Sequence, residues 1–303
     1  MAAANETLAL DAPAKINLYL RVTGRRPDGY HYLATLMQKV ALFDRVELRR
    51  ASAGIRVHCP DSNLPEDEGN LVYRAAHLFL SRMAPRLRGE TGVEITLYKR
   101  IPLAAGLGGG SSDAAAVLRG LDRLLATGCT ESELLALGGL LGADVPLFIV
   151  DWPVAWATGI GDRLRPAKTL AGYRILLVNP GFSVGTAWVY EKFALTAAGK
   201  KINLQILQAP PADEVDCPFT RRPIRPDELV NDLEAVTAAK FQEIGRLRQR
   251  LLAAGAEAAM MTGSGPTVFG IFREQEEDKA VACSRELARE FPQTFLVSPL
   301  TAD

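Results

Sequence analysis

The sequence has few of the residues that mark secreted, metal-binding or membrane proteins. Its 303 residues include four scattered cysteines, with no CxxC pair and no spacing typical of a metal site. We therefore expect reduced, incidental thiols in a cytoplasmic protein. The N-terminal stretch lacks the charged-then-apolar pattern of a signal peptide. No apolar run approaches the roughly 20 residues that a transmembrane helix needs, so we expect no membrane span.

An excess of either charge is also absent. Lysine plus arginine and aspartate plus glutamate both number 35, so the formal net charge at pH 7 is zero. Without a basic excess to attract polyanions, neither nucleic acid nor an anionic membrane is expected as the main partner. Histidine is scarce, with three residues, and no G-x-S-x-G motif occurs, which disfavours a Ser-His-Asp hydrolase.

Glycine, in contrast, is concentrated between a predicted strand and a predicted helix. Apolar and polar residues alternate over residues 93–98, which is typical of a half-buried strand. We expect Ser111 or Ser112 to cap the following helix and Gly128 to lie just past its end. Apolar residues recur there at helical spacing, at Ala114, Val117, Leu118, Leu121 and Leu125.

The connection itself, residues 106–112, reads GLGGGSS and predicts a phosphate-binding loop. Glycines allow positive φ and close approach of a ligand to the main chain. N–H groups at a helix N-terminus favour negative charge. A P-loop requires a lysine after its last glycine, and none follows Gly110, so this loop is not a P-loop. It is not a dinucleotide-binding fingerprint either, because Ser111 stands where the third glycine would be. A tight connection without a ligand is the less favoured alternative, because a plain turn needs only one or two glycines.

Two charged residues stand out by their surroundings. Every even position over residues 8–22 is apolar, which predicts a long strand with one buried face, and Lys15 and Asn17 project from the other. Lys15 could equally be an ordinary solvated lysine. Asp144 is the only polar residue between positions 139 and 150. A carboxylate in apolar surroundings is costly unless paired, so Asp144 is either a structural cap of a turn or a general base with Lys15 as its cationic partner.

Three further segments carry alternative interpretations. Tyr30 and His31 follow an Asp-Gly turn and offer a ring face and hydrogen bonds to a nucleobase, or are a buried tyrosine and a turn-capping histidine. Asn70 opens an amphipathic helix as its N-cap. Residues 260–267 form a second glycine loop, which a helix-to-strand turn would explain equally well. The remaining expected strands cover residues 33–49, 173–178 and 268–272. One helix is expected at 131–141, a second begins at an N-cap box at 231–234, and a third ends at about residue 254. A loop is expected at 196–226.

Together, these stretches resemble the signatures of the GHMP kinase superfamily, the small-molecule kinases named after galactose, homoserine, mevalonate and phosphomevalonate. The resemblance rests on KRIPLAAGLGGGSSDAAAVLRGLDRLL, LGADVPLF and MMTGSGPT, with PAKINLYLRV and RRPDGYHYL near the start. It implies an α+β fold with a ribosomal-S5-like domain followed by a ferredoxin-like domain. We expect an ATP-binding N-terminal domain at 1–163 and a C-terminal domain at 164–303 that closes over the substrate.

The resemblance further implies an ATP- and magnesium-dependent kinase that phosphorylates an alcohol. RRPDGYHYL resembles the members acting on a cytidine diphosphate polyol in isoprenoid precursor synthesis. A mevalonate- or homoserine-type kinase and a non-catalytic nucleotide-binding regulator are the alternatives. We expect a monomer or homodimer.

The residue roles below are those that the resemblance implies. Catalysis would fall to Lys15 and Asp144. The resemblance identifies no protein ligand for magnesium, and Ser112 is our candidate because a serine hydroxyl beside the glycines suits the ion. Substrate would be bound by Asn17, Tyr30, His31, Ile160, Thr186 and Tyr190, although Tyr190 could instead be one face of an amphipathic helix. ATP would be bound by Asn70, Leu71, Lys99, Pro102, Leu103, Ala104, Ala105, Gly106, Leu107, Gly108, Gly109, Gly110, Ser111 and Ser112.

Overall fold

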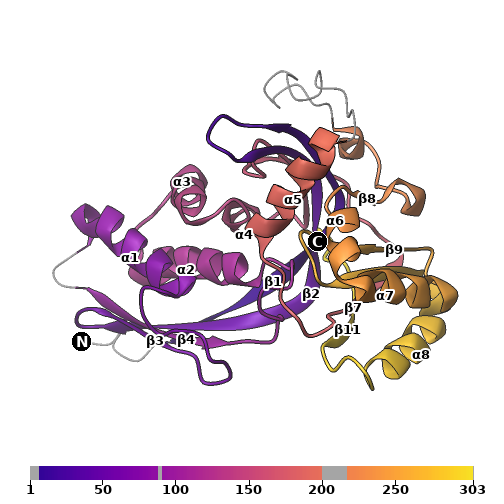
Figure 1. Ribbon diagram of the computed structural model, residues 1–303. Helices are drawn as coiled ribbons and strands as arrows, with labels where there is room; N and C mark the ends of the chain where they lie inside the picture. Colours follow the sequence, from indigo (N-terminus) through magenta and orange to yellow (C-terminus); the bar gives the residue numbers. More distant parts are fainter. Residues whose placement is uncertain (1–6, 88–90, 200–216, 303) are drawn as a thin grey trace. The chain divides into compact units, whose positions relative to one another are not determined.

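The computed structural model describes residues 7–87, 91–199 and 217–302. These residues fall into two compact units that interleave along the chain. Strands β1 (Thr7–Arg25) and β2 (His31–Ala51) each run through both units (Figure 1). The first unit takes its residues from 7–14, 42–101 and 108–151, and the second from 15–41, 102–107 and 152–302. The division into sequential domains at residue 163 stays a prediction.

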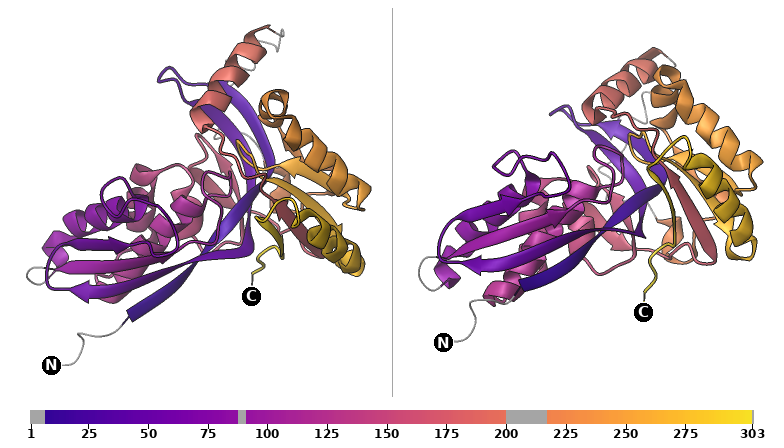
Figure 2. Two further views of the ribbon diagram at one scale, coloured as in Figure 1. Left: turned by 60° about the horizontal axis from the view of Figure 1, so that its bottom comes forward. Right: turned by 90° about the horizontal axis from the view of Figure 1, so that it is seen from below.

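In the first unit, helices cover one face of a mixed sheet, which contains both antiparallel and parallel strand pairs. The later part of β2 pairs antiparallel with β4 (Gly92–Tyr98), and β3 (Ile55–His58) joins β4 in parallel. The helices pack against one another on one face of these strands (Figure 2). They are α1 (Leu71–Met83), α2 (Gly109–Leu125), α3 (Glu131–Leu141) and α4 (Val145–Ile149), with a 3₁₀ turn at Ala84–Arg86.

The beginnings of the first two helices follow from their local sequence. Asn70 caps α1, because its side chain accepts the N–H of Val72, so the N-cap prediction is confirmed. Helix α2 begins at Gly109, with Gly108 as its N-cap at φ 71°. The expected capping by Ser111 or Ser112 is therefore wrong. Glycine adopts this left-handed conformation without steric cost, so the helix starts earlier and both serines lie in its first turn.

The second unit is built on an antiparallel sheet in the order β11-β7-β10-β9. Its strands are β7 (Tyr173–Val178), β9 (Ala258–Met261), β10 (Val268–Arg273) and β11 (Thr294–Val297). In the same unit, β1 pairs in parallel with β8 (Val230–Asn231) and β2 pairs antiparallel with β5 (Val154–Thr158), which pairs with β6 (Arg163–Pro166). Its helices are α5 (Thr186–Gly199), α6 (Glu234–Lys240), α7 (Gln242–Ala253) and α8 (Glu277–Leu287), with 3₁₀ turns at Pro218–Thr220, Pro226–Glu228 and Glu274–Glu276.

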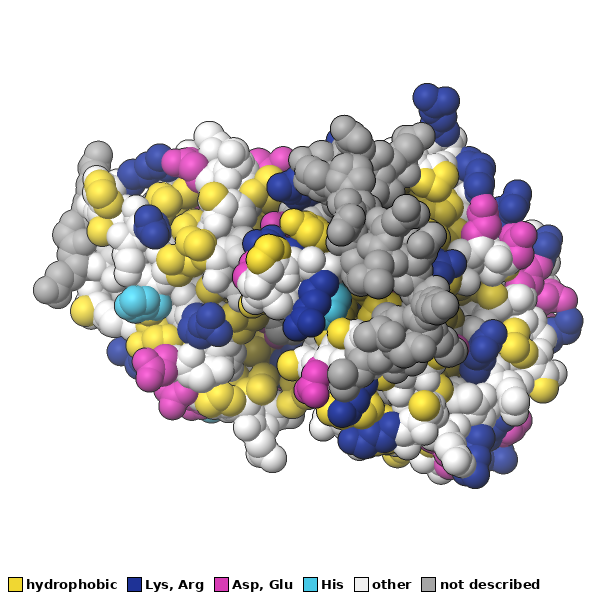
Figure 3. Space-filling view, turned by 45° about the horizontal axis from the view of Figure 1, so that its top comes forward, with side chains coloured by type: hydrophobic (Ala, Val, Ile, Leu, Met, Phe, Trp, Pro, Cys, Tyr) yellow, Lys and Arg dark blue, Asp and Glu magenta, His cyan; other side chains and the backbone are white. Residues whose placement is uncertain are grey.

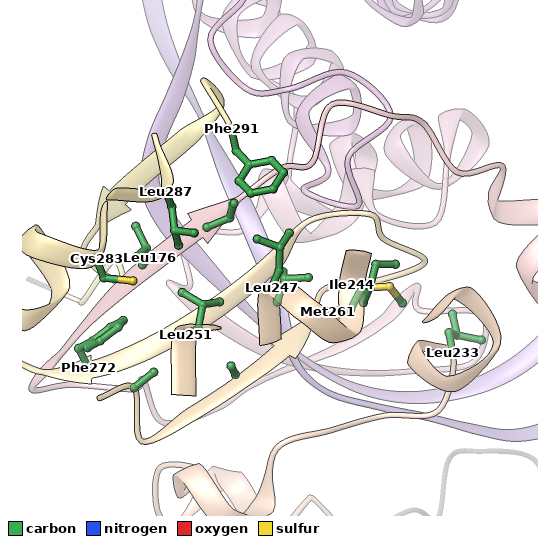
Figure 4. Close-up of a cluster of buried hydrophobic side chains, with 14 of the residues drawn as sticks. Leu176, Leu233, Ile244, Leu247, Leu251, Met261, Phe272, Cys283, Leu287 and Phe291 are labelled. Atoms are coloured by element: carbon green, nitrogen blue, oxygen red, sulfur yellow. The ribbon is translucent and has the colours of Figure 1, made fainter. Parts of the chain in front are cut away.

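The core of the second unit lies between its sheet and helices α6, α7 and α8 (Figure 4). Helix α7 contributes Ile244, Leu247 and Leu251 at helical spacing, and all three are fully buried. Each such side chain contributes about 1.5–3 kcal/mol when removed from water. A Cβ atom added at Gly270 of β10 would lie 3.3 Å from the Cβ atom of Leu251, so glycine lets α7 approach the strand closely.

Two expected boundaries differ from the structure. Helix α6 begins at Glu234, not at an N-cap box at Asn231. The Asn231 side chain instead accepts the N–H of Leu233 and donates to the carbonyl oxygens of Met261 and Gly263. The predicted loop at 196–226 is interrupted, because α5 extends to Gly199 and a 3₁₀ turn follows at Pro218–Thr220. Residues 200–216 of that prediction lie outside the described residues.

The surface reflects the balanced composition. On the face in Figure 3, the described basic and acidic side chains are interspersed, as the equal numbers of the two charges lead one to expect. Within the described residues, no helix combines the length and the apolar character needed to cross a membrane.

Candidate active site

At the start of α2, just after the first glycine loop, three backbone N–H groups make no hydrogen bond within the helix. Ala104, Gly106 and Gly108 all adopt positive φ, which turns the chain sharply into the helix. The first hydrogen bond of the helix joins the Ser112 N–H to the Gly108 carbonyl, at 2.9 Å. The N–H groups of residues 109–111 precede it and make no bond within the helix. These groups lie at the positive end of the helix dipole, which suits an anion.

Ser112 adds a hydroxyl that the protein itself does not satisfy. Its side chain is 1% exposed, and its Oγ has no hydrogen-bond partner among the described residues. A buried hydroxyl without a partner is unfavourable, so this atom fits a phosphate oxygen or Mg²⁺. No group of three or more histidine, cysteine, aspartate or glutamate side chains gathers to hold a metal in the described part of the chain. A magnesium ion here would therefore keep mostly phosphate and water ligands.

A buried charge cluster lies next to the start of α2 in the first unit. The Lys99 ammonium contacts Asp44 Oδ2 and lies 2.6 Å from Asp113 Oδ2. Asp44 Oδ1 also accepts the backbone N–H groups of Arg100 and Ile101, at 2.6 and 2.8 Å. Burial lowers the pKa of Lys99, but the two carboxylates together hold it above its ordinary value. Burial raises the pKa of Asp113 to about 7, against the influence of Lys99.

The cluster is in position to support the first turn of α2. A Cβ atom added at Gly109 would lie 3.0 Å from Ile101 Cγ2 and 3.3 Å from Lys99 Nζ. Lys99, expected at ATP, is thus 5% exposed and bound to two carboxylates, and its ATP contact stays a prediction. The sequence reasoning missed Asp44 and Asp113. Each borders an apolar run on one side only, residues 40–43 before Asp44 and residues 114–118 after Asp113, which is a weaker signal than the one that singled out Asp144.

Lys15 and Asn17 meet in the second unit, as side chains two residues apart on one face of β1. Lys15 Nζ donates to Asn17 Oδ1 at 2.7 Å. Both residues are buried, at 4% and 3% exposure, so the alternative of an ordinary solvated lysine is wrong. A buried ammonium must be paired or hydrogen-bonded to be tolerated. The strand therefore holds a positive charge in a defined place.

The second glycine loop packs against the first through its backbone. A Cβ atom added at Gly106 would lie 2.5 Å from the Thr262 carbonyl oxygen, and Gly106 has φ 77°, so both space and conformation require glycine. Thr262 Oγ1 accepts the Asn17 N–H at 2.9 Å. The second loop joins β9 to β10, so it is a strand-to-strand turn and not the helix-to-strand turn considered above. The hydroxyl of Thr262 was not recognised from the sequence.

The expected nucleobase residues are only partly brought together. The rings of His31 and Tyr190 stack, with centroids 5.2 Å apart and planes inclined by 23°. Burial, with a smaller effect of Arg25, lowers the pKa of His31 and favours its neutral form. Tyr30 is 63% exposed. Thr186 Oγ1 lies 2.9 Å from Ser264 Oγ.

The other expected site residues lie at element ends and turns. Asp144 occupies the N-cap position of α4, but its side chain makes no capping hydrogen bond to the helix, and its role as a general base stays a prediction. Asp144 and its neighbours at 141–143 are all half-buried. The Ile160 N–H donates to Asp162 Oδ1 within the turn after β5. Asn70 uses its amide to cap α1 and to donate to the Pro65 carbonyl, and its adenine contact stays a prediction.

The remaining expected ATP residues differ in exposure. Leu71 is half-buried at the start of α1. Pro102, Ala105 and Leu107 are buried, whereas Leu103 and Ala104 are exposed. The exposed pair stands in the turn that precedes the glycines, so this part of the loop is open to solvent.

Comparisons with known proteins agree with this geometry. Residues 70–151 match the GHMP kinases N terminal domain, and residues 222–293 match the GHMP kinases C terminal domain. A 4-diphosphocytidyl-2-C-methyl-D-erythritol kinase of Syntrophotalea carbinolica is 47% identical over 89% of this chain and 91% of its own. The enzyme of that name from Syntrophus aciditrophicus is 44% identical over 96% of this chain and 97% of its own.

A solved structure supports the same assignment. A crystal structure of 4-(cytidine 5'-diphospho)-2C-methyl-D-erythritol kinase is similar with a TM-score of 0.75 and 32% identity, covering 97% of this chain and 100% of that one. These matches confirm the two-domain α+β fold class expected from the sequence. Both the similarity and its extent lead to one conclusion: the chain belongs to the GHMP kinase family.

Proposed function

We propose that this protein transfers the γ-phosphoryl group of ATP to the C2 hydroxyl of 4-diphosphocytidyl-2-C-methyl-D-erythritol, in the non-mevalonate route to isoprenoid precursors. The observation that favours a cytidine-containing substrate is the stacking of the His31 and Tyr190 rings. They offer aromatic surface and a neutral imidazole, which suit a pyrimidine. Relatives more than 40% identical over nearly their whole length bear the name of this kinase.

In this proposal, the N–H groups at the start of α2 bind the terminal phosphates of ATP. Phosphoryl transfer needs alignment and neutralisation of charge more than covalent chemistry. The unpaired hydroxyl of Ser112 is the candidate protein ligand for Mg²⁺. When bound, the ion would neutralise charge on the phosphate oxygens.

The chemical step joins the substrate oxygen to the γ-phosphorus and breaks the bond from that phosphorus to the bridging oxygen, so that ADP leaves. Asp144 accepts the proton of the attacking hydroxyl. Lys15 contributes positive charge that stabilises the moving phosphoryl group. Asn17, held by Lys15 and Thr262, orients the polyol end of the substrate.

An assay of ADP release with the cytidylated substrate tests the activity. The same polyol phosphate without cytidine, mevalonate and homoserine serve as matched acceptors. We expect turnover only with the cytidylated compound. Equal turnover without the base would exclude this substrate while leaving a GHMP kinase, and no turnover with any acceptor would favour a non-catalytic nucleotide-binding protein.

A further inference from the structure

A buried threonine on the neighbouring strand is hydrogen-bonded to the Asn17 amide. Thr35 lies on β2, is 2% exposed, and its Oγ1 accepts the Asn17 Nδ2–H at 2.8 Å. The same hydroxyl donates to the carbonyl oxygen of Tyr19 at 2.7 Å. Three successive hydrogen bonds therefore run from Lys15 through Asn17 and Thr35 to the main chain.

The direction of these bonds follows from counting protons. A threonine hydroxyl has one proton. Thr35 donates this proton to the Tyr19 carbonyl oxygen, which can only accept a hydrogen bond. Toward Asn17 the hydroxyl can therefore only accept, and the amide must present its NH₂ group. The opposite end, Oδ1, must then face the Lys15 ammonium, which can only donate.

The main chain of Asn17 is held separately. Its N–H donates to Thr262 Oγ1 at 2.9 Å, which places the Cα atom. The Thr262 hydroxyl also lies 3.4 Å from both Asn17 Oδ1 and the Gly106 carbonyl oxygen, so its one proton makes a longer contact with the amide than the 2.8 Å hydrogen bond to Thr35. Of the two Nδ2 protons, one goes to Thr35, and the other has no partner among the described residues. That proton is a donor of defined direction beside a buried ammonium.

We propose that Thr35 is a positioning residue for the phosphoryl transfer, which sets the polarity of the Asn17 amide. Oδ1 of Asn17 then holds the Lys15 ammonium, and the remaining Nδ2 proton is directed to an oxygen of the acceptor substrate. This inference rests on the proposed function for the identity of that substrate. Thr35 itself contacts neither the substrate nor the reacting atoms.

Replacing the hydroxyl without changing the shape of the side chain is the direct test. In Thr35→Val, the amide loses the acceptor of its Nδ2–H group, and we expect kcat to fall by about 10- to 100-fold, the scale of a small misplacement at a reacting centre. KM for ATP should stay within about twofold of the wild-type value, because Thr35 acts only on the acceptor side. Thr35→Ser keeps the hydroxyl and should recover most of kcat.

A control variant separates this effect from a general loss of stability. Thr169 Oγ1 donates to Gln38 Oε1 at 2.9 Å in the same unit. Gln38 is three residues after Thr35 on β2, so their side chains project from opposite faces of the strand. Thr169→Val should leave kcat unchanged. Thr35→Ala, which also lacks the hydroxyl, replaces Thr35→Val if that variant does not fold.

A double-mutant cycle shows whether Thr35 acts through Asn17. In an Asn17→Ala background, Thr35→Val should lower kcat by less than about twofold further, because the amide it orients is gone. An undiminished kcat in Thr35→Val, no recovery in Thr35→Ser, or a full additional loss in the Asn17→Ala background would each overturn the inference. Failure of the wild-type protein to use the cytidylated substrate would instead refute the proposed function, and the same variants would then be compared on the acceptor that is used.

Discussion

The imidazole ring of His31 lies stacked on the phenol ring of Tyr190, with centroids 5.2 Å apart. One residue stands at the start of β2 and the other on α5, so the pairing depends on the fold of the second unit. Tyr30 and Tyr190 were both expected to bind the substrate. Tyr30 is exposed, and its role in binding the substrate stays a prediction.

Removing the aromatic surface at position 190 should weaken binding of the cytidylated substrate. Stacking of a base on an aromatic ring contributes about 1–3 kcal/mol, so Tyr190→Leu should raise the KM for that substrate roughly 5- to 150-fold. Tyr190→Phe keeps the ring and serves as the matched control. Steady-state kinetics at saturating ATP measures both. A KM equal in all three proteins would remove Tyr190 from the base site.

Asp144→Asn should abolish most of the activity without unfolding the protein. Loss of a general base typically lowers kcat by roughly 100-fold or more. Asp151 is a suitable control, because its carboxylate is 85% exposed and pairs with Arg119 at 2.8 Å. Asp151→Asn should retain normal kcat. Near-normal kcat in a folded Asp144→Asn protein, judged by its melting curve, would exclude Asp144 as the base.

Alanine substitutions at two exposed helical glycines, Gly110 and Gly139, test phosphate binding and helix stability independently. A Cβ atom added at Gly110 or at Gly139 would meet nothing within 4 Å. Alanine should stabilise either helix by about 0.5–1 kcal/mol, because glycine loses more conformational entropy on folding. Only Gly110→Ala should raise the KM for ATP, since its methyl group enters the proposed phosphate loop. A normal KM for ATP in that variant would argue against phosphate binding there.

The buried cluster around Lys99 should contribute strongly to stability. Lys99→Met leaves the carboxylates of Asp44 and Asp113 buried without their cation, and breaking a buried pair in this way costs about 3–5 kcal/mol. Lys279, whose exposed ammonium pairs with Glu276, provides the comparison. Lys279→Met should cost at most about 1 kcal/mol. Urea denaturation measures both losses, and similar small values would contradict the supporting role of the cluster.

The capping box of α3 predicts a change of stability with pH. The hydrogen bond from Arg86, followed by that from the Thr130 N–H, lowers the pKa of Glu133 to about 2, from an ordinary value of 4.5. The depressed pKa means that Glu133 stabilises the folded protein above its unfolded pKa and loses this contribution as the pH falls through about 2. The difference in melting temperature between wild type and Glu133→Gln should therefore shrink from pH 5 to pH 2. A pH-independent difference would contradict this interpretation.

Much of the secondary structure could be read from local patterns. The alternation over residues 8–22 and 93–98 corresponds to β1 and β4, and Asn70 caps α1 as expected. The start of α2 was placed too late, because serine is the commoner cap and the left-handed Gly108 was not anticipated. The family, the α+β fold class and the kinase activity were also recognised, because the glycine loops and LGADVPLF occur in one order in a single chain.

The sequence by itself determined the strands, the helices and the family, because those depend on periodicity and on short motifs between neighbouring residues. Tertiary structure alone decided that Asp44 and Asp113 hold Lys99, and that Thr35 and Thr262 hold Asn17. These partners lie 14 to 245 residues apart. No local pattern links them, because each hydrogen bond depends on where the fold brings two buried polar groups within reach.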